Sequence, residues 1–246
     1  MKIQLLSDLH TEHFSPAKAI SFLDSFDPAG VDVLVLAGDI MSLKFFDDAS
    51  ENLNVLLKKY PKVLYVLGNH EEYGTNPSQV SAVCAKLRET YTNLHIFDKP
   101  DVVVLDGQKF VCGSMFYRYQ EENEKYQDWM NDARYIQDFI PWVYQQNAAF
   151  IELAEREVDS SSVVITHYLP SYKCVNEQYK NSPLNRFFVC EMDELIAAKS
   201  PKLWAFGHTH GSVDMTLDQT RLICNPFGYR SEQGVNGFNP NLIIEV

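Results

Sequence analysis

The sequence has no long apolar run and no cysteine motif, and these absences argue against a membrane protein, a secreted protein and a disulfide-bonded protein. No stretch approaches the roughly 20 apolar residues that a membrane-spanning helix requires, so we expect no membrane partner. The apolar run at the N-terminus ends at Asp8, which is too early for a signal peptide. The five cysteines are odd in number and form no CxxC pair, so we expect free thiols in a reducing, cytoplasmic setting.

Positive charge is also scarce, because 21 Lys and Arg residues stand against 33 Asp and Glu residues and the net charge is −12. Most affinity for a nucleic acid backbone comes from basic side chains that neutralise phosphates, so a duplex nucleic acid partner is not expected. A small phosphorylated substrate remains compatible with this charge. Bound metal ions can reverse the sign of the electric field inside one cleft of an acidic protein.

Short apolar runs recur along the chain and end in small or polar residues, which is typical of strands buried on both faces. Helical patterns separate the early runs and predict a parallel sheet with crossover helices. Later runs, with a hairpin signal at Asp106-Gly107, predict antiparallel pairs. The 246 residues thus predict one α/β domain, 1–246, in which two sheets form a β-sandwich flanked by helices. The expected strands are 3–6, 33–37, 63–67, 102–105, 109–112, 163–165, 203–206, 212–216, 221–224 and 242–246, and the expected helices are 16–26, 46–60 and 77–90.

The segment 117–146 breaks this pattern, because it is rich in aromatic and charged residues, and we interpret it as a cap-like insertion. Its aromatic side chains would either complete the core or a dimer contact, or form a lid that sets specificity. Arg118 and Arg134 are candidates for substrate binding because guanidinium groups match phosphate oxygens, although surface ion pairs would also explain them. Asn131 and Asp132 would form either a helix cap or an element of the site.

Residues of the types that commonly bind metals follow five of the predicted strands. In an open α/β sheet, ligands bind beyond the carboxyl ends of the strands, so we expect these side chains to converge in one cleft. Five of the seven histidines belong to these groups, which a random scatter of core histidines would not produce. The five groups are Asp8-Leu9-His10, Gly38-Asp39, Gly68-Asn69-His70-Glu71, Thr166-His167 and Gly207-His208-Thr209-His210.

The spacing within two of these groups suggests how their side chains are aimed. Residues two apart in an extended segment point the same way, so we expect Asp8 and His10 to face the cleft together, and His208 with His210. The glycines that precede such groups would allow close backbone approach. Glu71 is expected to orient a neighbouring residue.

These residue types suit a pair of divalent cations. Two such ions, about 3.5–4 Å apart, need a shared anion, and Asp39 is the candidate. Imidazole and carboxylate ligands favour Mn, Fe, Zn or Ni. The ions would lower the pKa of bound water towards neutrality, and the resulting hydroxide would attack phosphorus while cations stabilise the equatorial oxygens. The sequence therefore predicts hydrolysis of a phosphate ester.

The order of the five groups, from Asp8 to His210, resembles the calcineurin-like metallophosphoesterase superfamily, and Asn225 to Tyr229 look like its small single-domain bacterial and phage members. The resemblance implies a four-layer αββα sandwich and two metal ions. His70 would act as a general acid or as a cation that faces the leaving group. The implied ligands are Asp8, His10, Asp39 and His210 for one metal, and Asp39, Asn69, His167 and His208 for the other.

Three alternatives stay open. Gly38-Asp39 is followed by Ile40-Met41 instead of the glycine-containing continuation of the Ser/Thr phosphatase branch, which puts protein phosphatase activity in doubt. A catalytically silent scaffold is disfavoured by the intact ligands, and a nuclease by the negative charge. Phosphatase and phosphodiesterase activities both fit, and no oligomeric state is indicated.

Tyr229, after a turn-rich stretch, is a further candidate for a residue that lines the cleft and contacts the substrate.

Overall fold

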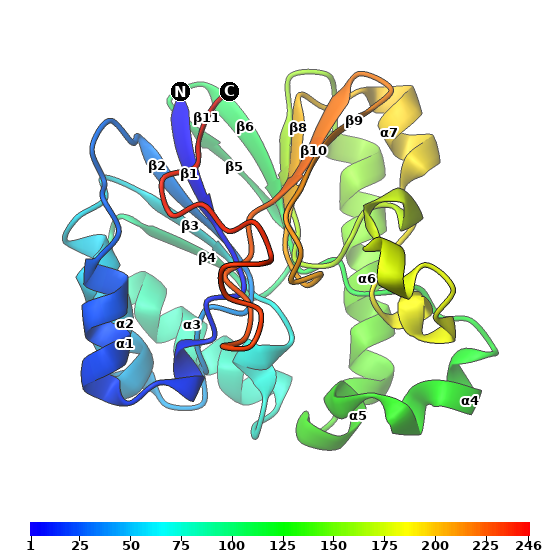
Figure 1. Cartoon of the computed structure of the whole chain (residues 1–246), viewed down its shortest axis with the longest axis horizontal. Helices are drawn as coiled ribbons and strands as arrows, with labels where there is room; N and C mark the ends of the chain where they lie inside the picture. The colour runs from blue at the N-terminus through cyan, green and yellow to red at the C-terminus, as the bar shows by residue number, and fades with distance from the viewer.

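A computed structural model describes all 246 residues, in which two β-sheets pack face to face between two layers of helices (Figure 1). The first sheet has the strand order β11–β1–β2–β3–β4. Strands β1 to β4 are parallel, and β11 pairs antiparallel with β1 at the edge. These strands are β1 (Lys2–Leu6), β2 (Val33–Ala37), β3 (Val63–Val66), β4 (Leu94–Phe97) and β11 (Ile243–Glu245).

The second sheet has the order β5–β6–β7–β8–β10–β9. Its four central strands are parallel, and β5 and β9 pair antiparallel at the two edges. Its strands are β5 (Asp101–Leu105), β6 (Gln108–Cys112), β7 (Val163–Ile165), β8 (Leu203–Phe206), β9 (Val213–Leu217) and β10 (Thr220–Cys224).

Helices cover the outer face of each sheet, as Figure 1 shows. The helices on the first sheet are α1 (Pro16–Asp24), α2 (Phe46–Leu57) and α3 (Pro77–Thr90), and those on the second are α6 (Phe139–Glu157) and α7 (Asp193–Lys199). Helix α3 begins where the sequence predicts, because Pro77 needs no helical N–H partner and the Asn76 side chain accepts from the Gln79 N–H at 3.0 Å.

The hydrophobic core has three parts, and alternate residues of β2 belong to two of them. Its residues Val33, Val35 and Ala37 face the second sheet, whereas Leu34 and Leu36 face the helices. Both faces of the strand are therefore buried, which explains why its sequence is apolar without interruption. The third part lies between the second sheet and the helices beyond it.

The predicted α/β fold with two packed sheets is confirmed, and all ten expected strands are present to within a residue or two. Strand β4 was not predicted, because its sequence LHIF is short and includes a polar residue. All five cysteines are buried free thiols, as expected. None of the helices has the length and apolar character needed to cross a bilayer.

The segment 117–146 forms α4 (Asn123–Tyr126), the 3₁₀ helix η3 (Gln127–Trp129), α5 (Asn131–Tyr135) and the first turns of α6. Met130, Ile136 and Phe139 are buried in the core of the second sheet. Trp129 and Tyr135 are exposed. The segment therefore packs on the sandwich as part of its core and presents only some of its aromatic side chains to solvent.

Candidate metal centre

The residues expected to bind metals meet where parallel strands of both sheets end. The ligand atoms of Asp8, His10, Asp39 and His210 all lie within 4.8 Å of one another. Those of Asp39, His167 and His208 form a second group with the same spacing. Asp39 belongs to both groups, which is the arrangement expected of a carboxylate shared by two cations.

In the first group, two imidazole rings face each other. The Nε2 atoms of His10 and His210 are 3.0 Å apart, while their Nδ1 atoms lie 2.9 Å from Glu12 and 2.8 Å from Glu232. Ionised carboxylates only accept hydrogen bonds, so each Nδ1 is a donor and each Nε2 is left for another partner. A metal cation between the rings would accept a lone pair from both Nε2 atoms.

The second group contains an unsatisfied buried nitrogen. His208 Nε2 is buried and makes no hydrogen bond. His167 is fully buried, its Nδ1 donates to the Ala37 carbonyl at 2.9 Å, and its Nε2 lies 3.3 Å from Asp39 Oδ2. Asn69 Oδ1 is 3.2 Å from His167 Nε2 and completes the group. Buried polar atoms are rarely left unpaired, so this nitrogen and carboxylate set fits a transition-metal ion.

The backbone at the ligands differs from the expected geometry. Asp8, His10, Asp39, His208 and His210 all have φ between 47° and 68°, in the left-handed region. The prediction that an extended segment aims these side chains is therefore wrong, because the chain curls sharply at the end of each strand. Such conformations are uncommon for residues other than glycine and cluster at functional sites.

The glycines near the ligands serve close packing, as the sequence suggests. Gly207 lies against the first sheet, where a Cβ atom would come within 2.6 Å of the Ala37 carbonyl and 2.9 Å of Asp8 Oδ2. Gly38 has a φ of 85°, and a Cβ there would overlap the His167 ring. Side chains at these two positions would push the two ligand groups apart.

Glu71 holds two of the ligand-bearing loops together. Its buried carboxylate accepts from the backbone N–H groups of Asp39, Ile40 and Gly68 at 2.7–3.0 Å, and from the Tyr65 hydroxyl at 2.6 Å. The carboxylate therefore fixes the loop that carries Asp39 relative to the loop that carries Asn69. Its place agrees with the expectation that Glu71 orients neighbouring residues.

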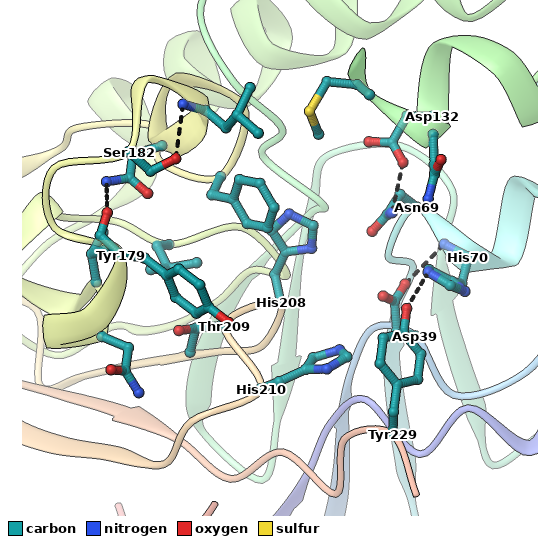
Figure 2. Close-up of a pocket in the computed structure, with 18 of the residues that line it drawn as sticks. Asp39, Asn69, His70, Asp132, Tyr179, Ser182, His208, Thr209, His210 and Tyr229 are labelled. Carbon is teal, nitrogen blue, oxygen red and sulfur yellow. Dashed lines mark hydrogen bonds between the residues drawn. The ribbon is translucent and has the colours of Figure 1, made fainter. Parts of the chain in front are cut away.

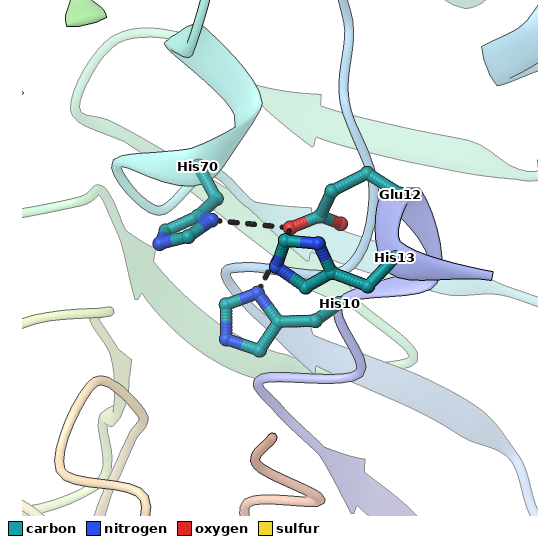
Figure 3. Close-up of side chains that lie close together, drawn as sticks. All are labelled: His10, Glu12, His13 and His70. Atoms are coloured by element: carbon teal, nitrogen blue, oxygen red, sulfur yellow. Dashed lines mark hydrogen bonds and ion pairs between the residues drawn. The ribbon is translucent and has the colours of Figure 1, made fainter. Parts of the chain in front are cut away.

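His70 lies beside the candidate ligands, and its ring is held by Glu12, which no sequence motif marks (Figure 3). Glu12 Oε1 is 3.1 Å from His70 Nδ1 and 2.9 Å from His10 Nδ1, and the exposed His13 ring lies 3.8 Å away. Burial lowers the pKa of His70, but the carboxylates of Asp39 and Glu12 outweigh burial and raise the pKa to about 9. The hydroxyl of Tyr229 lies 3.2 Å from His70 Nε2.

Asp132 is a second residue whose role the sequence did not reveal. It is buried and makes no helix cap, contrary to the cap interpretation; instead it accepts from Asn69 Nδ2 at 2.8 Å and from the Tyr73 hydroxyl at 2.6 Å. Its helix, α5, thus connects the inserted segment to the second ligand group. An aspartate at the start of a helix can either cap the helix or accept hydrogen bonds in the protein interior. The sequence is the same in both cases, so only the folded structure shows which role Asp132 has.

A cavity of about 460 Å³ opens beside the two ligand groups (Figure 2). Tyr229 lines it, as expected, but Arg118 and Arg134 do not. Arg118 is exposed and reaches towards the Glu191 carbonyl, and Arg134 donates to the Asp128 carbonyl within its own segment. The structure therefore places both arginines outside this cavity, near backbone carbonyls, and a contact of either with substrate stays a prediction.

The chain is thus an α/β sandwich in which two adjoining groups of candidate metal ligands lie between the ends of two sheets, beside a cavity. The chain matches the family model described as calcineurin-like phosphoesterase over residues 1–212, and it belongs to that family. It is 23% identical to the uncharacterized protein L509 of Acanthamoeba polyphaga mimivirus, a match that covers 99% of this chain and 96% of that protein.

Two solved structures share the fold. A phosphopantetheinyl hydrolase from Mycobacterium tuberculosis has a TM-score of 0.71 and 18% identity, with 94% of this chain and 90% of that chain covered. A dimetal phosphatase from Danio rerio has a TM-score of 0.50 and 13% identity, with 98% and 89% covered. At these identities the likeness concerns the fold alone.

Proposed function

We propose that this phosphoesterase is a dinuclear enzyme that uses two divalent ions of the Mn, Fe, Zn or Ni type. One ion would be held by Asp8, His10, Asp39 and His210, and the other by Asp39, Asn69, His167 and His208. The observation that carries the proposal is the placement of Asp39 in both ligand groups, next to the buried and unpaired His208 Nε2. The ions supply activation of water and charge neutralisation at phosphorus.

The residues around the ions suggest how the reaction is assisted. Asp39 Oδ1 accepts from the His70 backbone N–H at 2.9 Å, which ties the histidine to the shared ligand. Glu12 fixes His70 Nδ1, so His70 Nε2 faces the cavity beside Tyr229. Nε2 is then placed to donate a proton to the leaving oxygen or to stabilise charge on the phosphoryl group.

The alternative functions find less support in the cleft. A scaffold without activity would not need a buried, unpaired His208 Nε2 close to a carboxylate that belongs to both ligand groups. A nuclease needs basic side chains along the nucleic acid, and the cavity wall contains no Lys or Arg. The five buried free thiols suit work in a reducing compartment such as the cytoplasm.

The proposal is tested with metal-stripped protein reloaded with Mn, Ni, Zn or Mg. We expect turnover of 4-nitrophenyl phosphate or bis(4-nitrophenyl) phosphate after reloading, loss of turnover with EDTA, and a metal content of two ions per chain by elemental analysis. 4′-Phosphopantetheine esters belong in the same panel because of the M. tuberculosis hydrolase. Asp39→Ala should lose both ions. Two tightly bound ions with no turnover of any ester would contradict the proposal.

A further inference from the structure

The cavity beside the metal centre has a wall whose chemistry points to a substrate class. We propose that this cavity binds the organic group of the phosphate ester, and that this group is uncharged, largely apolar and carries no second phosphate. The inference rests on the proposed phosphoesterase activity. A volume of about 460 Å³ suits an organic group of drug-like size, since such sites measure roughly 300–1,000 Å³.

The cavity is continuous with the metal centre. Its wall includes the ligands Asp39, Asn69, His208 and His210, and it also includes His70. Figure 2 shows Tyr179 and Ser182 on the opposite side of the same space from Asn69 and Asp132. A phosphate at the ligands would therefore extend its ester group into the cavity, between these two sides.

Two segments far apart in the sequence supply the apolar walls. The inserted segment contributes Trp129 and Met130, and the segment 175–188 contributes Val175, Leu184 and Phe188. The Trp129 side chain is 63% exposed although it lies at the edge of the cavity. An exposed indole beside a reactive centre offers a large apolar surface that an organic group would cover.

The charges on the wall are already engaged. No Lys or Arg lines the cavity, and its acidic residues are Asp39, Asp132 and Glu232. Asp132 is bound by Asn69 and Tyr73, and Glu232 accepts from His210 and from the Tyr229 N–H at 2.7 Å. His70 is the one cationic side chain on the wall, and the proposed reaction uses it at the reacting phosphate, so a second anionic group would lose hydration without compensation. A cationic group would meet only carboxylates that already accept hydrogen bonds.

The remaining polar side chains are neutral hydrogen-bonding groups. Asn131, Tyr179 and Thr209 line the cavity, and so does Ser182, whose oxygen accepts from the Leu184 N–H at 3.2 Å and whose hydroxyl proton stays free to be donated. Such groups recognise amides, hydroxyls and carbonyls. The wall thus fits an extended neutral chain with a few polar atoms, and it disfavours nucleoside polyphosphates and nucleic acid.

The test compares 4-nitrophenyl phosphodiesters that share one leaving group and differ in the second ester group. We expect kcat/KM for the hexyl diester to exceed that for the methyl diester at least tenfold, because each buried methylene contributes about 0.8 kcal/mol. Diesters with a terminal carboxylate or ammonium group on the hexyl chain should lose most of this gain. Equal values for methyl and hexyl, or a preference for the carboxylate, would overturn the inference while leaving the proposed activity intact.

Substitutions in the cavity wall test whether Trp129 and Leu184 contact the alkyl group of the substrate. Trp129→Ala and Leu184→Lys should each lower the hexyl-to-methyl ratio at least threefold, and Leu184→Lys should favour the carboxylate diester. Tyr119→Ala is the matched control, because Tyr119 is an exposed aromatic of the same segment that does not line the cavity. Hexylphosphonate should also change the tryptophan fluorescence of the metal-loaded protein, less so in Trp129→Ala. If no ester turns over in any protein, the phosphoesterase proposal itself fails.

Discussion

Asp132 Oδ1 accepts a hydrogen bond from Asn69 Nδ2 at 2.8 Å, so a residue of the inserted segment orients a residue of the second ligand group. The bond decides which atom of the Asn69 amide faces the metal site. With its nitrogen turned to Asp132, Asn69 presents Oδ1 towards His167 Nε2. Residues that orient a metal ligand in this way contribute strongly to metal affinity.

We predict that Asp132→Ala weakens binding at one of the two metal sites by roughly 10–100-fold, because the Asn69 amide is then free to turn. Calorimetric titration of stripped protein with Mn or Zn would measure this, and the other site should keep its affinity. Asp128→Asn is the control, since Asp128 is an exposed carboxylate of the same segment. Unchanged affinity at both sites would show that the contact only supports the fold.

The second prediction concerns Glu12, which contacts both His10 and His70. The Glu12 carboxylate helps to raise the pKa of His70, so Glu12→Gln should lower that pKa. If protonated His70 assists the leaving group, the alkaline limb of the kcat profile then moves to lower pH, and kcat falls by roughly 10–100-fold. His13→Ala, beside the same carboxylate but exposed, should leave the profile unchanged. A lower kcat with an unshifted limb would limit Glu12 to a structural role.

The third prediction concerns protons released by metal binding. Burial lowers the pKa of His167, but the carboxylates of Asp39 and Asp8 outweigh burial and raise it to about 10 in the metal-free protein. At pH 7 the ring is therefore protonated, and it must lose the Nε2 proton before that nitrogen can bind a metal. Binding should release protons at pH 7, and metal affinity should rise with pH towards about 10.

Calorimetry in two buffers with different ionisation enthalpies would count these protons. His167→Ala should release fewer of them, whereas His95→Ala should match the wild type, because His95 lies on β4 and outside both ligand groups. Metal binding without proton release at pH 7 would mean that His167 is already neutral before the metal arrives.

The fourth prediction concerns Glu72, whose side chain is only 3% exposed and has one unpaired oxygen. Burial, with the nearby charges of Glu71 and Asp98, raises its pKa from 4.5 to about 8. The native state therefore binds a proton that the unfolded chain releases above pH 4.5, so this contribution to stability is complete below pH 4.5 and is lost as pH rises towards 8.

Glu72→Gln removes the ionisable group, and we predict that it stabilises the protein at pH 7 by about 1–3 kcal/mol relative to wild type. Urea unfolding at pH 5 and pH 7.5 would measure the change, and the gain should be larger at the higher pH. Glu89→Gln, an exposed site on α3, is the control. Equal effects at both pH values would contradict the raised pKa.

The sequence predicts most of the fold, and which candidate ligand residues lie close together, for one physical reason. Strands buried on both faces are continuous apolar runs, and the residues that follow them stand at the ends of parallel strands. This places Asp39 after β2 and His167 after β7 without any knowledge of distances. The same reasoning gives the remaining candidate ligands.

The residues that the sequence did not predict are those whose role depends on contacts formed only after folding. Glu12, Asp132 and Glu232 lie in short helices or loops, and nothing in their local sequence marks them as partners of Asn69 or the histidines. The left-handed backbone at the candidate ligands is equally hidden, because Asp and His are enriched in this conformation but only a few per cent of residues other than glycine adopt it. Tertiary contacts decide both features.

The pairing of β1 with β11 has a consequence for how the protein matures. The Phe227 and Gly228 N–H groups donate to the Ser7 and Asp8 carbonyls, so the loop that carries the first ligand is braced by residues made more than 200 positions later. On a ribosome, early segments are free to fold before late ones emerge. Here the nascent chain cannot brace the loop that carries Asp8 until residues 227 and 228 have been made, so assembly of the candidate metal centre waits for synthesis of that late segment.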